Sequence, residues 1–319
     1  MIFFLRPRTK ERNNEGYSDR NLRRARRSSF ATIAYSRASS RRTCGEGQCG
    51  ERHPVDYKIR SGKYPAVQED KLPYVLGRDA CGVVETTQSG FFKTGDVVYG
   101  VSGIGRGSYA EYVVFKESEL AHKPSSLENT VAAAVPLAGL TAWQGLFRYG
   151  RVEAGQRVLI HAGSGGVGHF SIQFAKARGA HVITTVSKTH ADFVREIGAD
   201  EVIDYKEQHF EKELRDLDMV FDLIGGETQD KSWGVLKKGG MLVSTLNPPS
   251  QEKAAEYGVR ATRFTVTETG SELSEIADLI ENGKVVVKVS KTFPLEDAAS
   301  AHRLIEEGHT EGKIVLTIG

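Results

Sequence analysis

A glycine-rich stretch near the middle of the chain constrains the fold more than any other feature. It reads VLIHAGSGGVGHFSIQFAKARGA, and Gly163, Gly165 and Gly168 fit the pattern G-x-G-x-x-G. A strand-like apolar run precedes the glycines, a helical pattern follows them, and a second strand-like run, HVITTV, comes next. In that context the glycines allow a tight turn and bring backbone N–H groups and a helix N-terminus close to a diphosphate. The stretch therefore predicts a dinucleotide-binding loop, and the alternative is a glycine-rich turn without a ligand.

The segments around this loop alternate between strand-like and helix-like patterns. Strands are expected at 156–162, 180–187, 201–205, 218–226 and 240–246, and helices at 168–179, 189–199, 209–217 and 228–239. Strands that alternate with helices of this length form right-handed βαβ units in a parallel sheet. The fold class predicted is therefore α/β, with a doubly wound parallel sheet of the Rossmann type. Runs such as LPYVLGRDACGVVE and YAEYVVF, between residues 54 and 125, predict a separate and mostly β domain.

Composition narrows the class of protein further. The 319 residues contain no apolar run of the roughly 18–20 residues that a membrane helix needs, so we expect no membrane partner. Three cysteines in a chain of this length argue against a disulfide framework and favour a reducing compartment, which predicts a cytoplasmic protein. Residues 54–319 carry a formal charge of −6, which gives no support for nucleic-acid binding.

The first 53 residues differ from the rest of the chain. They hold 13 Lys or Arg against 5 Asp or Glu, and they show no strand-like alternation. An Arg- and Ser-rich head of this kind is typical of a nucleic-acid arm, an organellar targeting peptide or a segment without a folded role. Cys44, Cys49 and His53 lie close together in it, but we expect no zinc site there.

The end of the second strand of the dinucleotide unit indicates which cofactor is used. NAD sites usually place Asp or Glu at this point, where the carboxylate binds the ribose 2′-hydroxyl. Here the residues are Ser187 and Lys188, and the next acid is Asp192. A hydroxyl and an ammonium suit a 2′-phosphate, so the sequence favours NADPH over NADH. The alternative for Lys188 is a solvated surface lysine.

From residue 54 onward the chain resembles the zinc-independent quinone oxidoreductase (zeta-crystallin-like) group of the medium-chain dehydrogenase/reductases. The resemblance implies a GroES-like catalytic domain at 54–125, completed by 285–319, and a Rossmann domain at 126–284. It also implies NADPH-dependent hydride transfer to a quinone or to the double bond of an α,β-unsaturated carbonyl. Many relatives are dimers, so a homodimer is possible. The blocks that carry the resemblance are PVDYKIRSGKYP, LPYVLGRDACGVV, GDVVYG, YAEYVV, LTAWQGL, HAGSGGVGHFSIQFAKARGA, GADEVIDY, VFDLIGG and GHTEGKIVLTI.

The block GRDACG bears on zinc. Zinc-dependent members of the family carry a His-Glu pair where this chain has Arg78 and Asp79, and the four-cysteine structural zinc lobe is absent. A catalytic zinc needs about three protein ligands, and residues 54–319 offer no such set. We therefore expect chemistry without a metal, and we expect Cys81 to be a small buried residue.

The resemblance places the substrate beside the block VDYKIRSGKY. It implies that Lys58 and Tyr64 donate hydrogen bonds to the substrate or orient it, with Asp56 and Arg60 in support. Without a metal, the oxyanion that develops on the substrate would need such a donor, or water. Lys58 could equally be a solvated lysine, and Tyr64 a core aromatic residue.

Cofactor contacts follow from the same resemblance. We read His161 and His169, which flank the loop, as packing or surface residues without an acid–base role. The predicted contacts comprise the phosphate loop, the 2′-phosphate site, the nicotinamide half and one residue after the last Rossmann strand: Ala162, Ser164, Gly165, Gly166, Val167; Ser187, Lys188, Tyr205; Thr141, Ile224, Gly225; and Leu246.

The family normally begins with about 40 residues that include two strands and an Asn beside the substrate, and residues 1–53 do not show them. One hypothesis is a shifted reading frame: with suitable codons, NEGYSDRNL at 14–22 read one nucleotide later gives MKAIVIETYG, a typical opening for the family. Residues 36–51 can be treated likewise, whereas 30–35 do not follow the shift. The alternative is a transit peptide. If the head is native, the protein could instead be an NADPH-binding protein with little or no turnover.

Overall fold

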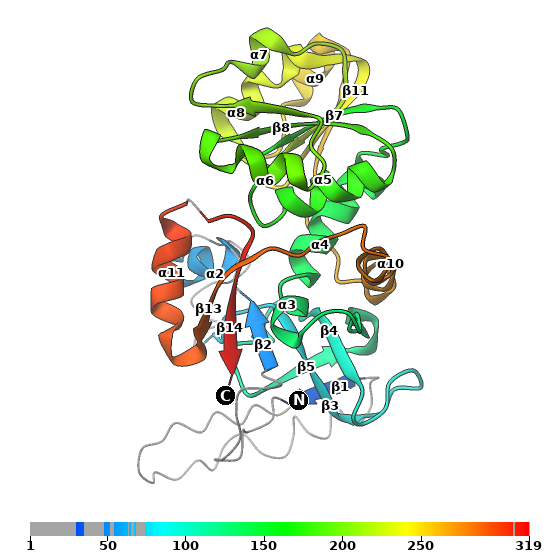
Figure 1. Ribbon diagram of the computed structural model, residues 1–319, viewed down its shortest axis with the longest axis vertical. Helices are drawn as coiled ribbons and strands as arrows, with labels where there is room; N and C mark the ends of the chain where they lie inside the picture. The colour runs from blue at the N-terminus through cyan, green and yellow to red at the C-terminus, as the bar shows by residue number, and fades with distance from the viewer. Residues whose placement is uncertain are drawn as a thin grey trace.

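The computed structural model describes residues 30–34, 48–51, 54–62, 64, 67, 74–308 and 310–318. Within these ranges the strands form two sheets, one of six strands and one of eight, and a helical segment passes between them (Figure 1). This arrangement confirms the predicted α/β class. None of the described helices combines the length and the hydrophobicity that crossing a bilayer requires.

The six-stranded sheet is parallel throughout and has the order β12-β11-β10-β7-β8-β9. Its first strand in sequence, β7, lies beside β10, so the strand order reverses between them. Ligands of such sheets bind at this reversal, outside the carboxyl ends of the strands. The strands are β7 (Arg157–His161), β8 (His181–Val186), β9 (Glu201–Asp204), β10 (Leu217–Asp222), β11 (Leu236–Ser244) and β12 (Arg260–Arg263).

Helices cover both faces of this sheet, with α5 and α6 on the side that faces the other domain and α8 and α9 on the far side (Figure 1). The central strands are buried on both faces, which is why Val158, Leu159 and Ile160 follow one another without a polar interruption. The helices of this domain are α5 (Gly168–Ala177), α6 (Ala191–Glu196), α7 (Phe210–Glu213), α8 (Gly226–Lys231) and α9 (Gln251–Tyr257).

The eight-stranded sheet has the path β13-β14-β2-β3-β1-β5, and β4 joins β3 to β6. Its last two strands in sequence come from the end of the chain, where β14 pairs with β2. The strands are β1 (Phe30–Ala34), β2 (Gln48–Glu51), β3 (Asp79–Thr87), β4 (Val97–Val101), β5 (Tyr112–Lys116), β6 (Leu120–His122), β13 (Val289–Pro294) and β14 (Lys313–Ile318). Helices α2 (Pro54–Arg60) and α11 (Ala298–Glu306) pack against each other beside it (Figure 1).

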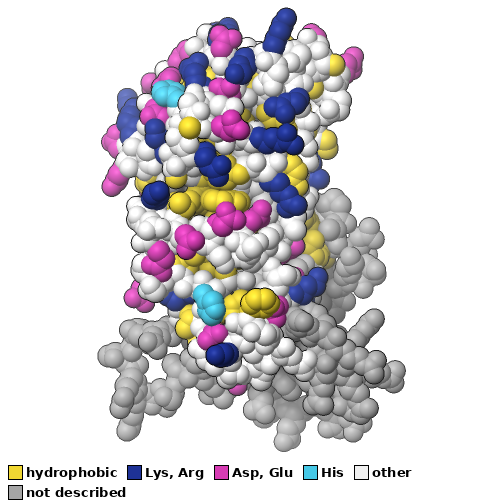
Figure 2. All heavy atoms as spheres, turned by 90° about the vertical axis from the view of Figure 1, so that its right-hand side faces the viewer, with side chains coloured by type: hydrophobic (Ala, Val, Ile, Leu, Met, Phe, Trp, Pro, Cys, Tyr) yellow, Lys and Arg dark blue, Asp and Glu magenta, His cyan; other side chains and the backbone are white. Residues whose placement is uncertain are grey.

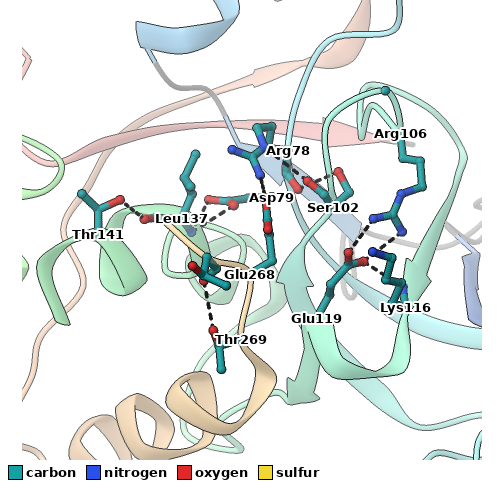
Figure 3. Close-up of polar contacts among 12 residues, drawn as sticks. Arg78, Asp79, Ser102, Arg106, Lys116, Glu119, Leu137, Thr141, Glu268 and Thr269 are labelled. Atoms are coloured by element: carbon teal, nitrogen blue, oxygen red, sulfur yellow. Dashed lines mark hydrogen bonds and ion pairs between the residues drawn. The ribbon is translucent and has the colours of Figure 1, made fainter. Parts of the chain in front are cut away.

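Helices α3 (Asn129–Ala132), α4 (Pro136–Trp143) and α10 (Gly270–Glu281), with a π-helix at Gln144–Tyr149, lie between the two sheets. Two contacts join α4 and α10 to the eight-stranded sheet. The backbone N–H of Leu137 donates to the carboxylate of Asp79 at 3.0 and 3.1 Å, and the Tyr99 hydroxyl donates to the carbonyl oxygen of Leu273 at 2.7 Å. Asp79 therefore holds the N-terminus of α4 on the end of β3 (Figure 3).

Two of the shortened helices have a clear cause, and an edge strand of the six-stranded sheet was not predicted. The helix expected at 228–239 ends at Lys231, because Leu236 already begins β11 in pairing with Leu217 of β10. The helix expected at 209–217 spans 210–213, since the chain is extended at Leu214 as it enters β10. Strand β12 was not predicted, because RATR is short, polar and at the sheet edge.

Residues 1–53 also differ from expectation. The sequence predicted no strand there, but the structure places β1 and β2 in this segment, both within the eight-stranded sheet. The run FATIA of β1 contains Phe, Thr and Ile, which suit a strand, and it pairs with β3 on one side and β5 on the other. The frame-shift hypothesis itself stays a hypothesis. Cys44 and His53 lie outside the described residues, and only the backbone of Cys49 is described.

Candidate dinucleotide site

The glycine-rich loop leads from β7 to α5. The surroundings of each motif glycine explain why that position has no side chain. A Cβ on Gly163 would collide with the Thr184 hydroxyl oxygen of β8, and one on Gly168 would collide with the carbonyl oxygen of Ala162. A Cβ on Gly165 would meet that same carbonyl oxygen at 3.3 Å and otherwise face open space among the described residues. Gly163 and Gly168 thus allow the chain to pack closely, and Gly165 leaves the backbone open to a ligand.

The loop begins in a strained conformation at Ala162, whose φ is 56°. Residues other than glycine rarely adopt this left-handed region, and such strain persists where the surrounding structure enforces it. The Ala162 N–H donates to the Thr185 hydroxyl at 3.3 Å, and that hydroxyl lies 3.1 Å from Nδ1 of His161. The start of the loop is therefore fixed from the interior of the sheet.

His161 is buried, and its partners determine which ring nitrogen carries the proton. The Ser232 hydroxyl donates its hydrogen to the carbonyl oxygen of Thr228 at 2.7 Å, so it can only accept from Nε2 of His161, 3.1 Å away. Nδ1 then accepts from Thr185. Burial lowers the pKa of His161 to about 4, which keeps the ring neutral near pH 7. This matches the predicted packing role and gives no acid–base function.

A cavity of about 460 Å³ opens in front of the loop at the carboxyl ends of the strands. Two large apolar side chains in its wall are exposed, Tyr205 at 56 % and Ile224 at 49 %. Exposed apolar surface inside a cavity favours a ligand with an aromatic or apolar face. The lining residues are His161, Ala162, Ser164, Gly165, Thr185, Val186, Ser187, His190, Tyr205, Gln208, His209, Phe210, Glu211, Ile224, Glu227, Thr228, Lys231, Gly308 and Thr310.

The wall that carries Ile224 is shaped by Asp222, a fully buried residue at the end of β10. Its Oδ1 accepts the N–H groups of Ile224 at 3.0 Å and Gly225 at 2.7 Å. Its Oδ2 accepts from Nε2 of Gln229 and from the Ser244 hydroxyl, both at 2.9 Å. Four donors on one carboxylate fix the turn that follows β10.

The end of the chain closes the cavity from the other domain. The N–H of Gly312 donates to the carbonyl oxygen of Ser164 at 2.8 Å, which ties the segment before β14 to the glycine-rich loop. The Thr310 hydroxyl oxygen is buried at the cavity and has no hydrogen-bond partner among the described residues. Across the opening, Nδ1 of His190 lies 3.1 Å from the carboxylate of Glu311, which also pairs with Lys288 at 3.1 Å.

Two family models match the chain: "Alcohol dehydrogenase GroES-like domain" at residues 48–125 and "Zinc-binding dehydrogenase" at 197–316. "NAD(P)H oxidoreductase RTN4IP1, mitochondrial" of Danio rerio is 34% identical over 314 residues, covering 83% of this chain and 81% of the relative. The chain belongs to the medium-chain dehydrogenase/reductases, in their quinone oxidoreductase-like group.

Two further comparisons agree with this membership. "NADPH-dependent alkenal/one oxidoreductase, chloroplastic" of Arabidopsis thaliana is 38% identical over 280 residues, covering 83% of this chain and 69% of the relative. The solved quinone oxidoreductase from Coxiella burnetii is 33% identical and superposes with a TM-score of 0.82, covering 91% of this chain and 90% of that one. The eight-stranded domain is thus the GroES-like domain that the resemblance implied.

The two cavities beside the glycine-rich loop bring together some of the residues predicted to contact the cofactor. Lys188 lines a smaller cavity of about 140 Å³ next to the first one, and Ser187 lines both. Arg195, which the sequence reading did not name, lines the smaller cavity too. Of the predicted contacts, Ala162, Ser164, Gly165, Ser187, Tyr205 and Ile224 line the large cavity, whereas Thr141, Gly166, Val167, Gly225 and Leu246 do not.

The residues that sequence reasoning missed come mostly from three places. His190, Gln208 and His209 follow strands β8 and β9, Thr228 and Lys231 belong to α8, and Gly308 and Thr310 precede β14. The carboxyl ends of neighbouring parallel strands could have indicated the first group. The last group depends on a chain reversal that no local pattern reveals.

Two of the four predicted substrate-side residues have structural partners. Asp56 is fully buried, and its carboxylate accepts the Gly77 N–H at 2.9 Å and lies 3.5 Å from the Tyr109 hydroxyl. Arg60 forms an ion pair with Glu306 of α11. These contacts hold α2 in place.

Lys58 and Tyr64, the other two, are half-buried. Their roles toward a substrate stay predictions.

The block GRDACG leads into β3 of the eight-stranded sheet, and Figure 3 shows its Arg78 and Asp79 beside Glu268 and Leu137. Arg78 is buried, forms an ion pair with Glu268 and donates from Nε to the carbonyl oxygen of Ser102 at 3.2 Å. Cys81 is buried, as predicted, and its Sγ lies 3.8 Å from Oδ1 of Asn129. Within the described ranges, no group of three or more His, Cys, Asp or Glu side chains could hold a metal ion.

Proposed function

We propose that the chain is an NADPH-dependent oxidoreductase that transfers hydride to a quinone or to the carbon–carbon double bond of an α,β-unsaturated carbonyl, without zinc. The observation that carries the proposal is the pair Ser187 and Lys188 directly after β8, where the adjoining cavities meet. The Arabidopsis thaliana relative is named as NADPH-dependent, which supports the same cofactor here.

The residues present fit this cofactor. Gly165 leaves the loop backbone open, the wall offers exposed Tyr205 and Ile224, and the buried Thr310 hydroxyl has no partner among the described residues, so it could bind a ligand oxygen. When bound, NADPH supplies the hydride. The chain would hold the diphosphate on the loop and the 2′-phosphate at Ser187 and Lys188.

Fewer of the described contacts define the substrate side of the site. We infer that Lys58 or Tyr64 donates a hydrogen bond to the oxygen that gains charge, and that closing the site between the two domains excludes water. Asp56 and Arg60 act through the position of α2, because their side chains already bind Gly77, Tyr109 and Glu306.

Charge and hydrogen bonding at GRDACG support the proposal that no zinc is used. Arg78 is a cation, so it repels a metal ion, and both carboxylate oxygens of Asp79 already accept the Leu137 N–H. The expected result is full activity after exhaustive chelation and less than stoichiometric zinc by elemental analysis. Restoration of activity by added zinc alone would contradict this part of the proposal.

NADPH oxidation tests the function directly. The chain should oxidise NADPH in the presence of quinones or enones, and turnover with NADH should be lower by about tenfold or more. Lys188→Ala should reduce the preference for NADPH without weakening NADH turnover, and Lys284→Ala, an exposed lysine away from the cavity, is the matched control. Tight NADPH binding without oxidation by any acceptor would support the binding-protein alternative.

The remaining assignments are proposals of the same kind. The strands of each sheet are compatible with a Rossmann domain at 126–284, but β1 and β2 also join the eight-stranded sheet, so the domain proposed at 54–125 with 285–319 begins before residue 54. On the face drawn in Figure 2, basic and acidic side chains are interspersed, which does not favour a nucleic-acid partner. A cytoplasmic location and a homodimer are also proposed. Because two relatives are named mitochondrial and chloroplastic, a test of the location by cell fractionation should include the organelle fractions.

A further inference from the structure

The large cavity spans the carboxyl ends of four neighbouring strands, which stand in the order β10-β7-β8-β9. The loop after β7 would hold the diphosphate, and Ser187 after β8 would hold the ribose that carries the 2′-phosphate. Residues that follow the two outer strands flank this path: Tyr205 follows β9 and Ile224 follows β10, and both are exposed apolar side chains in the cavity wall. The adenine base, attached to the same ribose, would therefore lie between Tyr205 and Ile224.

Glu211, the second residue of α7, lines this cavity with a side chain that is largely covered, at 23 % exposure. Two basic groups lie near its Oε1: Nδ1 of His209 at 3.6 Å and Nζ of Lys231 at 4.0 Å. Both distances exceed those of a hydrogen bond. Among the described residues, then, no group donates a hydrogen bond to the Glu211 carboxylate. A largely covered acceptor without a donor indicates that a ligand group completes it.

The polar side chains around Glu211 already have partners. Lys231 forms an ion pair of 2.7 Å with Glu227. Gln208 donates from Nε2 to the carboxylate of Glu213 at 3.1 Å, and its Oε1 accepts the backbone N–H at the end of β9 at 2.9 Å. These contacts leave Glu211 as an acceptor on this side of the cavity that a ligand donor could use.

Resting on the proposed function, we propose that Glu211 is a specificity-determining residue whose carboxylate accepts a hydrogen bond from the 6-amino group of the cofactor's adenine. Adenine carries a donor at this position, whereas hypoxanthine and guanine carry an oxygen that only accepts. An ionised carboxylate donates no hydrogen bond, so Glu211 pairs with adenine and repels a 6-oxopurine. Ile224, which the resemblance assigned to the nicotinamide half, then contacts the adenine.

This recognition of the base is separate from recognition of the phosphate groups. Lys188 serves the 2′-phosphate and Gly165 opens the loop to the diphosphate, and both groups are the same in an adenine and a hypoxanthine dinucleotide. Tyr205 and Ile224 offer apolar contact to any purine, because every base has a flat π-face. A difference in affinity between the two dinucleotides therefore reports on the polar edge of the base, where Glu211 acts.

The first experiment uses the unsubstituted full chain. Dissociation constants of NADPH and of reduced nicotinamide hypoxanthine dinucleotide phosphate are measured by fluorescence titration, and kcat and KM are measured for both with one quinone. The hypoxanthine cofactor should bind about tenfold more weakly, with KM raised to match and kcat unchanged, because the base is remote from the transferred hydride. Equal affinities, or a difference confined to kcat, would overturn the proposal.

The second experiment tests Glu211 itself. In Glu211→Gln the amide can accept from the 6-amino group or donate to a 6-oxygen, so the tenfold preference for the adenine cofactor should fall to about twofold or less. The ratio is the readout, because removing a negative charge strengthens both anionic dinucleotides alike. Glu252→Gln, at an exposed glutamate of α9 that lines neither cavity, is the charge-matched control and should keep the tenfold ratio. An unchanged ratio in Glu211→Gln would overturn the assignment.

Two fragments locate the effect in the base. Adenosine 2′-monophosphate should bind more tightly than inosine 2′-monophosphate by the same factor as the dinucleotides, since neither fragment has a diphosphate or a nicotinamide. Equal binding of the fragments would contradict the proposal. If Glu211→Gln does not fold, the dinucleotide and fragment ratios of the unsubstituted chain decide.

The outcomes distinguish this inference from the proposed function. A chain that binds and oxidises both dinucleotides equally well retains the proposed function and refutes the role of Glu211. A chain that binds neither dinucleotide refutes both.

Discussion

The carboxylate Oδ1 of Asp222 accepts a hydrogen bond of 2.7 Å from the backbone N–H of Gly225, three residues later, at the end of the central strand β10. Gly225 has a φ of 76° at this turn, so a carboxylate and a glycine together set the cavity wall that carries Ile224. The contact links the packed interior of the sheet to the surface that a dinucleotide would meet.

Asp222→Asn should lower the free energy of unfolding by about 2–3 kcal/mol, because an amide nitrogen would replace Oδ2 and face the donors of Gln229 and Ser244. Urea denaturation measures the change, and the NADPH dissociation constant should rise with it. Asp230→Asn, at an exposed ion pair with Lys253, is the control and should change stability by less than about 0.5 kcal/mol. Equal effects of the two substitutions would contradict the assigned role of Asp222.

Gly168→Ala should destabilise the protein by about 2 kcal/mol or more, because the added methyl group would meet the backbone of Ala162 and Gly163, which cannot move without opening the loop. A fall in thermal midpoint together with loss of NADPH binding is expected. At Gly234 a Cβ would meet no described atom within 4 Å, so Gly234→Ala should be nearly neutral. A stable Gly168→Ala protein that binds NADPH normally would show that the loop is looser than described.

The ion pair of Arg78 with Glu268 should couple the two domains energetically. Arg78→Met alone should cost about 3 kcal/mol, since it leaves a largely buried carboxylate, and the double variant with Glu268→Gln should be more stable than the two separate losses predict. A double-mutant cycle by chemical denaturation gives the coupling free energy. Strict additivity would show that the pair contributes little.

Acid should destabilise the protein through two buried histidines. Burial lowers the pKa of both His161 and His169 to about 4, below the value of about 6.5 in the unfolded chain. The unfolded state therefore binds more protons between these values, and stability that is complete above pH 6.5 is lost as the pH falls toward 4, by about 1.4 kcal/mol per pH unit for each histidine.

Denaturation midpoints from pH 7 to pH 4 measure this loss. In His169→Leu the slope should be about half as steep, whereas His122→Gln, at an exposed ring that packs on Phe92, should leave it unchanged. An identical slope in the unsubstituted chain and in His169→Leu would assign the acid sensitivity to other groups.

Sequence patterns correctly predicted those parts of the site whose residues are close together along the chain. Three predicted features lie within one βαβ unit: the apolar run from Val158 to Ile160, the glycines at 163 and 168, and the lack of an acidic residue after β8. Because these residues are close together in the sequence, they are also close together in the fold. Cys81 was assigned correctly for the same reason, as a small residue inside a strand.

The parts that sequence reasoning missed depend on contacts between distant segments. Thr310 reaches the cavity because β14 returns to pair with β2, and Asp56 is a buried acceptor because Gly77 and Tyr109 surround it. Strand β1 was missed because its run of five residues stands between Arg-rich stretches that hide it. It is also the stretch that the frame-shift hypothesis could not decode, so the strand and that hypothesis concern different residues.

The pairing of β14 with β2 has a consequence for synthesis on the ribosome. The six-stranded sheet is complete once Arg263 has been made, whereas the sheet that begins with the first strands of the chain needs residues 289–318. Domains generally fold in the order in which they are translated. In this chain the order is inverted: the second domain can fold during translation, while the first must keep the open edge of β2 from aggregating until the last residues have been made.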